Sequence, residues 1–339
     1  MLLFVVLFPC CYTLKQGGIM LGYLHSAEPL ESLLTGIEQD SEEYQKNKIF
    51  VDNINSIRKF AIEDLGLKST KNYTKYVEID RDYLAAIVSA SEKLSFKRHE
   101  WHFPIVGAVP YKGFFTAKDA QSEAQKLSKK NLDVWIRQVD AFSTLGFFSD
   151  PLYSYMKEYP IDELADLIIH ESMHATVFVK GDMNFNEELA EIVGTEGARL
   201  YMEYMYGKDA VQIQARADRK ADSKTFVNYV QDLIPLLDVI YKSDISDELK
   251  TEQKEITIKN FQEKFAMEYD KNFKTDSYKN FASIKINNAY LELFRLYYNK
   301  SSDLKMLYET HGSDIKKFIT AAKTIKGRKL PIEQLRNAL

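Results

Sequence analysis

The chain has 339 residues, of which 45% are apolar and 28% are charged, and its formal net charge is −4. These values exclude a fibrous or largely disordered chain, and they fit one large globular unit. Lysine and arginine are spread along the sequence, so the charge pattern gives no reason to expect nucleic acid as a partner. Because the two cysteines are Cys10 and Cys11, a disulfide framework and cysteine metal ligands are excluded from the rest of the chain.

The first element in chain order is a strongly apolar run over residues 1–12. It is too short to span a bilayer, which takes about 20 residues, but it matches the apolar core of a signal peptide. We therefore expect residues 1–14 to be a signal or membrane-anchoring segment, with Cys10 or Cys11 as a lipid attachment site. This predicts an exported protein that is anchored to the membrane and, in a bacterium, faces the periplasm or the cell exterior. A buried N-terminal hydrophobic segment is the alternative, since no lysine or arginine precedes the run.

The spacing of apolar residues predicts the elements that follow. Helical spacing predicts helices over 28–66. Shorter apolar runs broken by proline and glycine predict a small mixed sheet within about 76–148. A strong pair of helices is predicted within about 160–205, and about 210–339 is predicted to be nearly all helical. We expect a single unit over 15–339 with an α+β, predominantly helical fold.

The first helix of that pair, predicted over 160–179, carries the sequence His-Glu-Ser-Met-His at 170–174. Residues four apart lie on one face of a helix, so His170 and His174 can bind one Zn²⁺ ion. Glu171 is rotated away from the metal but can reach a metal-bound water, from which it would take a proton. This pattern is typical of metalloproteases. The alternative is two histidines with no metal role.

A catalytic zinc site needs a third protein ligand and a position left open for water. The sequence Asn-Glu-Glu-Leu-Ala-Glu follows at 186–191, where a second helix is predicted to begin. The loop before it allows this helix to turn back against the first. We rank Glu187 first as the third ligand, Glu191 second and Glu188 last, and we expect Glu188 to be solvated. Glu191 is also the candidate for accepting the free ring N–H of His170.

Candidate substrate-binding residues are Asn287, Asn288 and Gly146. The amide side chains of Asn287 and Asn288 can both donate and accept hydrogen bonds with a substrate backbone. Helix capping or interhelical bonding is the alternative for both. Gly146 follows a predicted strand whose edge could pair with an extended peptide, or it makes a turn. His99 and His102 fit a partly buried pair with no metal role.

Six motifs spread over most of the chain carry a family resemblance. They lie at residues 111–115, 141–152, 167–182, 185–190, 193–199 and 287–291. Together, from about residue 12 to 310, they resemble the bacterial family of predicted aminopeptidases, which belongs with the gluzincins. In gluzincins the third zinc ligand is the glutamate of an Asn-Glu-x-x-Ala motif, which implies Glu187 here. Most members begin with a lipoprotein signal and one anchoring cysteine, whereas this sequence has Pro9 and two adjacent cysteines.

The resemblance implies a gluzincin-like pair of zinc helices between the small sheet and the C-terminal helical region. We predict one zinc ion per chain and hydrolysis of peptide bonds by a zinc-bound water that Glu171 activates. The resemblance implies peptides as substrates, with N-terminal residues removed. The alternatives are a zinc endopeptidase or amidase with the same centre, and a non-catalytic membrane-anchored lipoprotein that keeps the scaffold.

Overall fold

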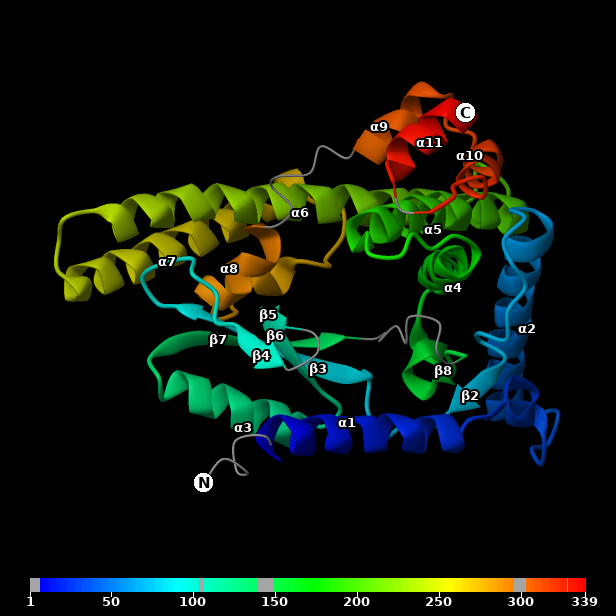
Figure 1. The fold of residues 1–339 in the computed structure, drawn as a ribbon, viewed down its shortest axis with the longest axis horizontal. Helices are drawn as coiled ribbons and strands as arrows, with labels where there is room; N and C mark the ends of the chain where they lie inside the picture. The colour runs from blue at the N-terminus through cyan, green and yellow to red at the C-terminus, as the bar shows by residue number, and fades with distance from the viewer. Residues whose placement is uncertain (1–6, 104–106, 140–148, 296–302, 328) are drawn as a thin grey trace. The chain divides into compact units, whose positions relative to one another are not determined.

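The structure is a computed structural model of the full chain. It describes every residue except 1–6, 104–106, 140–148, 296–302 and 328. The fold is α+β and mostly helical, with small mixed and antiparallel sheets (Figure 1). The fold class predicted from the sequence is therefore confirmed. Gly146 lies outside the described residues.

Backbone contacts divide the chain into two compact units. We call the first the sheet unit, which is made of Met1–Met20, Tyr83–Ala141 and Gln214–Lys300. The second, the histidine unit, is made of Leu21–Asp82, Phe142–Ile213 and Ser301–Leu339. Each unit combines segments that are far apart in the sequence, which is why no single linker is visible in the composition. The boundary at residue 14 and the single unit over 15–339 stay predictions.

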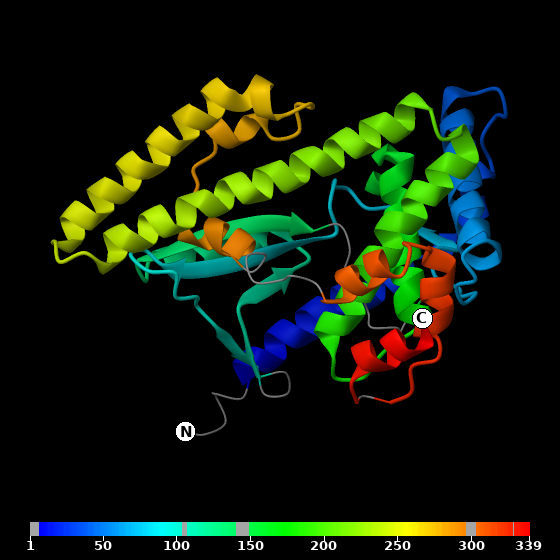
Figure 2. The ribbon, with the colours of Figure 1, turned by 90° about the horizontal axis from the view of Figure 1, so that it is seen from above.

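The sheet unit contains two antiparallel sheets and a helix. Its elements here are β3 (Ala85–Glu92), β4 (Trp101–Phe103), β5 (Gly107–Val109), β6 (Tyr111–Phe114), α3 (Ala117–Ser128) and β7 (Leu132–Val139). β3 is the middle strand of the order β6-β3-β7, with Ile87 opposite Gly113 on one side and Arg137 on the other. β4 pairs with β5. Ala120 and Leu127 of α3 are buried with side chains of β3, so α3 covers one face of the larger sheet (Figure 1), and Figure 2 shows the strands from above.

Further helices and a 3-10 turn complete the sheet unit. They are most of α1 (Leu7–His25), most of α6 (Val211–Lys242), α7 (Asp247–Asn272), the 3-10 turn η3 (Lys279–Ala282) and α8 (Asn288–Arg295). Aromatic side chains fill the space between them: Phe265 of α7 lies edge-on to Phe226 of α6 and to Phe281 of η3. The buried carboxylate of Asp222 accepts hydrogen bonds from the backbone after α7. The aromatic-rich C-terminal sequence therefore builds the core of this unit.

The histidine unit is mainly helical. Its elements are β1 (Glu28–Pro29), η1 (Leu30–Leu34), α2 (Glu42–Glu63), β2 (Lys75–Val77), β8 (Leu152–Tyr153), η2 (Ser154–Glu158), α4 (Ile161–Thr176), α5 (Met183–Tyr206), α9 (Asp303–Thr310), α10 (Ile315–Ala322) and α11 (Pro331–Ala338). β2 pairs antiparallel with β1 and parallel with β8, which makes the mixed sheet. Buried Ile168 and Met173 of α4 and Tyr201 of α5 belong to the core, where Phe60 of α2 lies edge-on to Tyr201.

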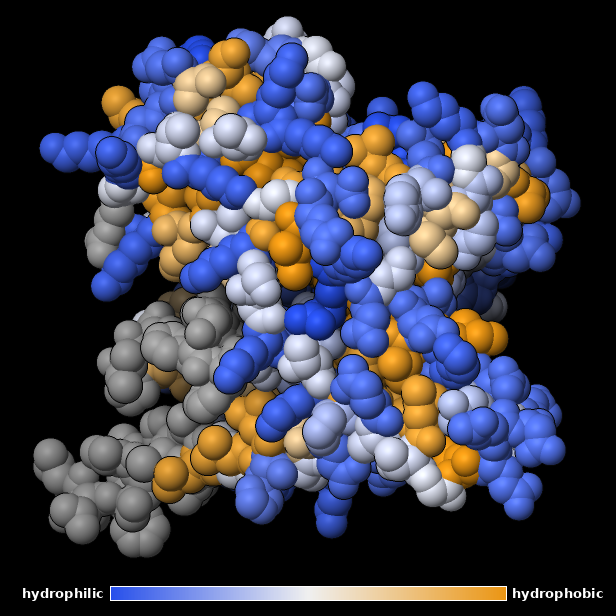
Figure 3. All heavy atoms as spheres, turned by 90° about the vertical axis from the view of Figure 1, so that its right-hand side faces the viewer, coloured by the Kyte–Doolittle hydropathy of each residue, from blue (hydrophilic) through white to orange (hydrophobic). Residues whose placement is uncertain are grey.

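The N-terminal residues that the structure describes form α1, which continues well past residue 14. No helix among the described residues has the length and apolarity that crossing a membrane requires. The signal or anchoring role of residues 1–14 stays a prediction. Figure 3, seen from the side of Figure 1 on which α2 lies, shows a hydrophilic surface with scattered apolar areas, which is ordinary for a folded protein.

Candidate metal centre

α4 places the two motif histidines on one face. It begins after Pro160, and its acidic first turn, Asp162 and Glu163, suits the positive end of the helix dipole, as predicted. The ring centroids of His170 and His174 are 4.8 Å apart, and their Nε2 atoms are 3.1 Å apart. The one-turn spacing predicted from the sequence is therefore realised with both Nε2 atoms pointing to the same place.

The loop between α4 and α5 is held by the asparagine that precedes Glu187. The amide of buried Asn186 accepts a hydrogen bond from the backbone N of Val179 at 2.8 Å and donates one to its carbonyl O at 2.9 Å. The backbone is extended at Val177, with φ −134° and ψ 123°, so α4 ends at Thr176 rather than at the predicted Val179. The side chain of Asp182 caps α5 through the N–H of Phe185, so α5 begins earlier than predicted.

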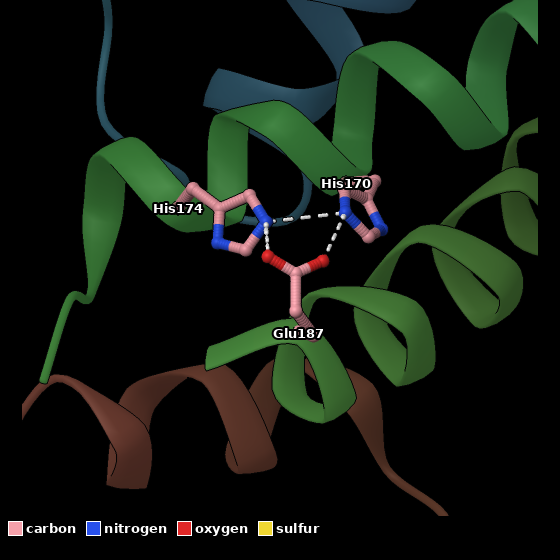
Figure 4. Close-up of side chains that lie close together, drawn as sticks. All are labelled: His170, His174 and Glu187. Atoms are coloured by element: carbon pink, nitrogen blue, oxygen red, sulfur yellow. Dashed lines mark hydrogen bonds and ion pairs between the residues drawn. The ribbon is translucent and has the colours of Figure 1, made fainter. Parts of the chain in front are cut away.

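α5 brings Glu187 to the two rings (Figure 4). Its Oε1 is 3.5 Å from Nε2 of His174, and its Oε2 is 3.7 Å from Nε2 of His170. The three donor atoms lie within 4.8 Å of one another and could hold a metal ion. Within the residues that the structure describes, this is the one cluster of at least three histidine, cysteine, aspartate or glutamate side chains with that property. Glu187, which the sequence ranks first as the third ligand, is thus the acid of α5 that belongs to this cluster.

The spacing of the donor atoms fits a small divalent ion. Ligands bound tetrahedrally at about 2.0–2.1 Å are roughly 3.4 Å apart. The two ring nitrogens are 3.1 Å apart; one carboxylate oxygen of Glu187 is 3.5 Å from Nε2 of His174, and its other oxygen is 3.7 Å from Nε2 of His170. Two imidazole nitrogens and one carboxylate oxygen are also a usual donor set for catalytic zinc, with a fourth position left for water.

Burial sets the charge of the two histidines. It lowers the pKa of His170, and the neighbouring His174 lowers it further, while Glu187 and Asp166 act in the opposite direction. Burial likewise lowers the pKa of His174 against the pull of Glu187. A lowered histidine pKa means that the neutral ring, which is the form that binds metal, prevails at neutral pH.

We expect metal affinity to be nearly constant from pH 8 down to about 6.5, the ordinary pKa of histidine. Below that, two rings must lose protons before metal can bind, so affinity falls by up to about 100-fold per pH unit once both are charged. Competition with a chromophoric chelator from pH 8 to pH 5 measures this curve. A loss of affinity that begins above pH 7 would mean that the histidine pKa values are raised, contrary to the burial of the rings.

Glu171 lies next to His170 on α4 and is half-buried. Burial raises the pKa of its carboxyl to about 7, and the negative charges of Asp150 and Glu187 contribute in the same direction. A carboxyl with this pKa exchanges its proton readily at neutral pH, which suits a group that must both take and return a proton.

Two neighbours of Glu171 were not found from the sequence. Tyr73 is buried with its backbone at φ 58°, and its N–H donates to the carbonyl O of Asp150 at 2.7 Å. Burial and the charge of Glu171 raise the pKa of Tyr73, so its hydroxyl keeps its proton. The sequence offers 21 tyrosines, and no spacing rule connects residue 73 to residue 171.

The other acidic candidates on α5 differ from the expected picture. Glu191 is exposed, and no hydrogen bond or ion pair within the described residues joins it to His170. Its role behind His170 stays a prediction. The expectation that Glu188 is solvated is wrong: the side chain is half-buried and its Oε1 is shielded from solvent. Glu188 follows the buried Phe185 by three positions and precedes the buried Leu189, which places it beside the buried face of α5.

Asn287 and Asn288 lie in the sheet unit, where protein groups occupy their amides. Asn287 donates to the carbonyl O of Val134 and accepts from the N–H of Tyr290. Asn288 is fully buried; its amide donates to three backbone carbonyls, and Tyr241 donates to its Oδ1. These are the capping and bridging bonds that the sequence leaves as the alternative. Substrate binding by either residue stays a prediction.

Gly194 allows α5 to approach α4 closely beside His170. A methyl group at this position would lie 2.8 Å from Oδ1 of Asp166, 3.0 Å from the Asp166 carbonyl O and 3.0 Å from Cβ of His170. Contacts this short with backbone and Cβ atoms would force the two helices apart. A helical glycine costs stability on propensity grounds, so its presence here is explained by the close packing.

We expect Gly194→Ala to lower the free energy of unfolding by about 1–2 kcal/mol. Overpacking typically costs about 1–3 kcal/mol, and the better helix propensity of alanine returns at most about 1 kcal/mol. Urea denaturation measures the difference. Gly18→Ala on α1 is the matched control, since a methyl group there meets nothing within 4 Å. Equal stability of wild type and Gly194→Ala would contradict the close approach.

A family model described as "Putative aminopeptidase" matches residues 11–339 of the chain. No curated protein and no solved structure matches the chain.

Proposed function

The chain belongs to the putative aminopeptidase family, and from this premise we propose that it is a zinc-dependent peptidase that removes N-terminal residues from peptides. The observation that carries the proposal is the meeting of His170, His174 and Glu187 around one point. Two neutral imidazoles and a carboxylate suit zinc, although the same donors accept other divalent ions.

The chain's own residues divide the chemistry between them. His170 and His174 would hold the ion through Nε2, and Glu187 through its carboxylate. A bound zinc ion would polarise the substrate carbonyl and lower the pKa of a water toward about 7. Glu171 accepts a proton from the attacking water as the oxygen of that water bonds to the carbonyl carbon. Glu171 then delivers the proton to the amine nitrogen as the C–N bond breaks. The pKa of about 7 for Glu171 favours both transfers.

An aminopeptidase must also bind a free α-amino group, for which a carboxylate is the natural partner. Glu196 is bound by Arg199 at 2.9 Å, and Arg199 also pairs with Glu203, so these charges are engaged with one another on α5. Glu191 lies one helical turn beyond Glu187 and is exposed. We therefore propose Glu191 as the candidate for contacting the substrate amine.

The proposal is tested with paired peptides that differ only in a free or acetylated N-terminus. The zinc-loaded protein is expected to release the first residue from the free peptide, and to leave the acetylated one intact. A chelator should abolish the reaction and added zinc should restore it. Faster cleavage of the acetylated peptide, or cleavage at internal bonds of both, would favour an endopeptidase and contradict removal of N-terminal residues.

A further inference from the structure

α4 carries four ionisable side chains in one row along its axis. Asp162, Asp166, His170 and His174 follow one another at four-residue spacing. On a helix such residues lie one turn apart, and each side chain leans toward the N-terminus over the one before it. His174 leans over His170 in this way, with their Nε2 atoms 3.1 Å apart. By the same geometry, His170 is expected to lean toward Asp166.

Contacts from α5 place the Asp166 carboxylate beside His170. The position that a methyl group at Gly194 would take is 2.8 Å from Oδ1 of Asp166 and 3.0 Å from Cβ of His170. The Asp166 carboxylate and Cβ of His170 therefore both face α5 at Gly194, where α5 has no side chain. On that stretch, Thr195 Oγ1 donates a hydrogen bond to Oδ2 of Asp166 at 3.4 Å. Asp166 is half-buried where the two helices meet.

Two acids can be compared as the carboxylate behind His170, namely Asp166 on α4 and Glu191 on α5. Glu191, the acid that the sequence pattern favours for this role, is exposed, and no hydrogen bond or ion pair among the described residues joins it to His170. Asp166 is thus the better placed of the two acids.

We propose that Asp166 is the carboxylate that positions His170, with Thr195 fixing Asp166 and Gly194 leaving room for it. The inference rests on the proposed metal site. A histidine that binds metal through Nε2 carries its proton on Nδ1, and a carboxylate near that edge fixes the tautomer, orients the ring and makes Nε2 a stronger ligand. Asp166 acts through His170 and is a positioning residue, not a catalytic one.

The test compares Asp166→Ala and Asp166→Asn with Glu191→Gln in the full chain. Zinc affinity is measured by chelator competition, and the melting temperature is measured without metal. We expect Asp166→Ala to weaken zinc binding by about 10–100-fold, which is typical for loss of an outer-shell partner. Asp166→Asn should lose less, because its amide oxygen still accepts a hydrogen bond. Glu191→Gln should bind zinc within about twofold of wild type.

A second measurement separates positioning from a general loss of stability. Nitrogen-15 shifts of the His170 ring in the metal-free protein report which nitrogen carries the proton. We expect the Nδ1–H form in wild type and Asp166→Asn, and a mixture of tautomers in Asp166→Ala. The inference is overturned if wild type binds zinc and Asp166→Ala binds it equally well, or if Glu191→Gln is the variant that loses affinity. Failure of wild type itself to bind zinc would refute the proposed function and, with it, this inference.

Discussion

Replacing Glu171 by glutamine is expected to lower kcat/KM for peptide hydrolysis by about 10²–10⁴-fold, the usual contribution of a general acid–base group. Glutamine has nearly the same shape and fits the same half-buried position on α4, but it cannot accept the proton of the attacking water. His170, His174 and Glu187 are unchanged in this variant, so its zinc affinity should stay within about twofold of wild type. The loss should therefore appear in turnover and not in metal content.

Hydrolysis of aminoacyl anilides, together with zinc content per chain, measures both quantities on one preparation. Glu163→Gln is the matched control, because Glu163 is an exposed acid in the first turn of the same helix, about two turns before His170. It should behave as wild type in both measurements. Substantial turnover in Glu171→Gln would show that another group carries the proton, and loss of zinc would show that Glu171 belongs to the ligand set.

The second large effect is expected from His174→Ala. Removing one of three ligands should weaken zinc binding by more than the roughly 10–100-fold that loss of an outer-shell partner costs. The metal-free fold should change little, because the ring is half-buried and lies against His170 and Glu187, two residues of the same centre. Any ion that binds only the folded state raises its stability, by about 2.7 kcal/mol at a concentration 100 times the Kd.

Thermal unfolding with and without zinc measures this linkage. Wild type should melt at a clearly higher temperature when zinc is added, and His174→Ala should melt at the same temperature with and without it. His311→Ala provides a matched control, since His311 is an exposed histidine that hydrogen-bonds within its own helix end. If His174→Ala gained as much stability from zinc as wild type does, the ion would be binding elsewhere.

The core of the centre could be predicted from the sequence because its spacing follows from helix geometry alone. The positions of His170 and His174 relative to each other depend only on a continuous helix between them. Glu187 required one further step, a loop that turns the second helix back. The Asn186 clamp on Val179 supplies that turn, and the asparagine was already part of the recognised motif.

Other features depend on contacts between segments that no local pattern reports. Asp166 shares the four-residue spacing of the histidines, so its place in the row could have been read from the sequence. The proximity of Asp166 to α5 could not be predicted, because it depends on a close approach of the two helices that glycine at position 194 allows. Asn288 was a plausible substrate ligand by residue type, yet its amide is used to hold the backbone after β3. Division into two units was invisible because each unit is assembled from three separate segments.

The most direct test of the metal centre is a crystal structure of the zinc-loaded protein with an anomalous difference map at the zinc edge. One peak per chain is expected, at about 2.0–2.2 Å from Nε2 of His170, Nε2 of His174 and a carboxylate oxygen of Glu187. A peak at any other place in the chain, or a zinc ion bound to the histidines with Glu187 turned away and no other oxygen ligand from the protein, would contradict it.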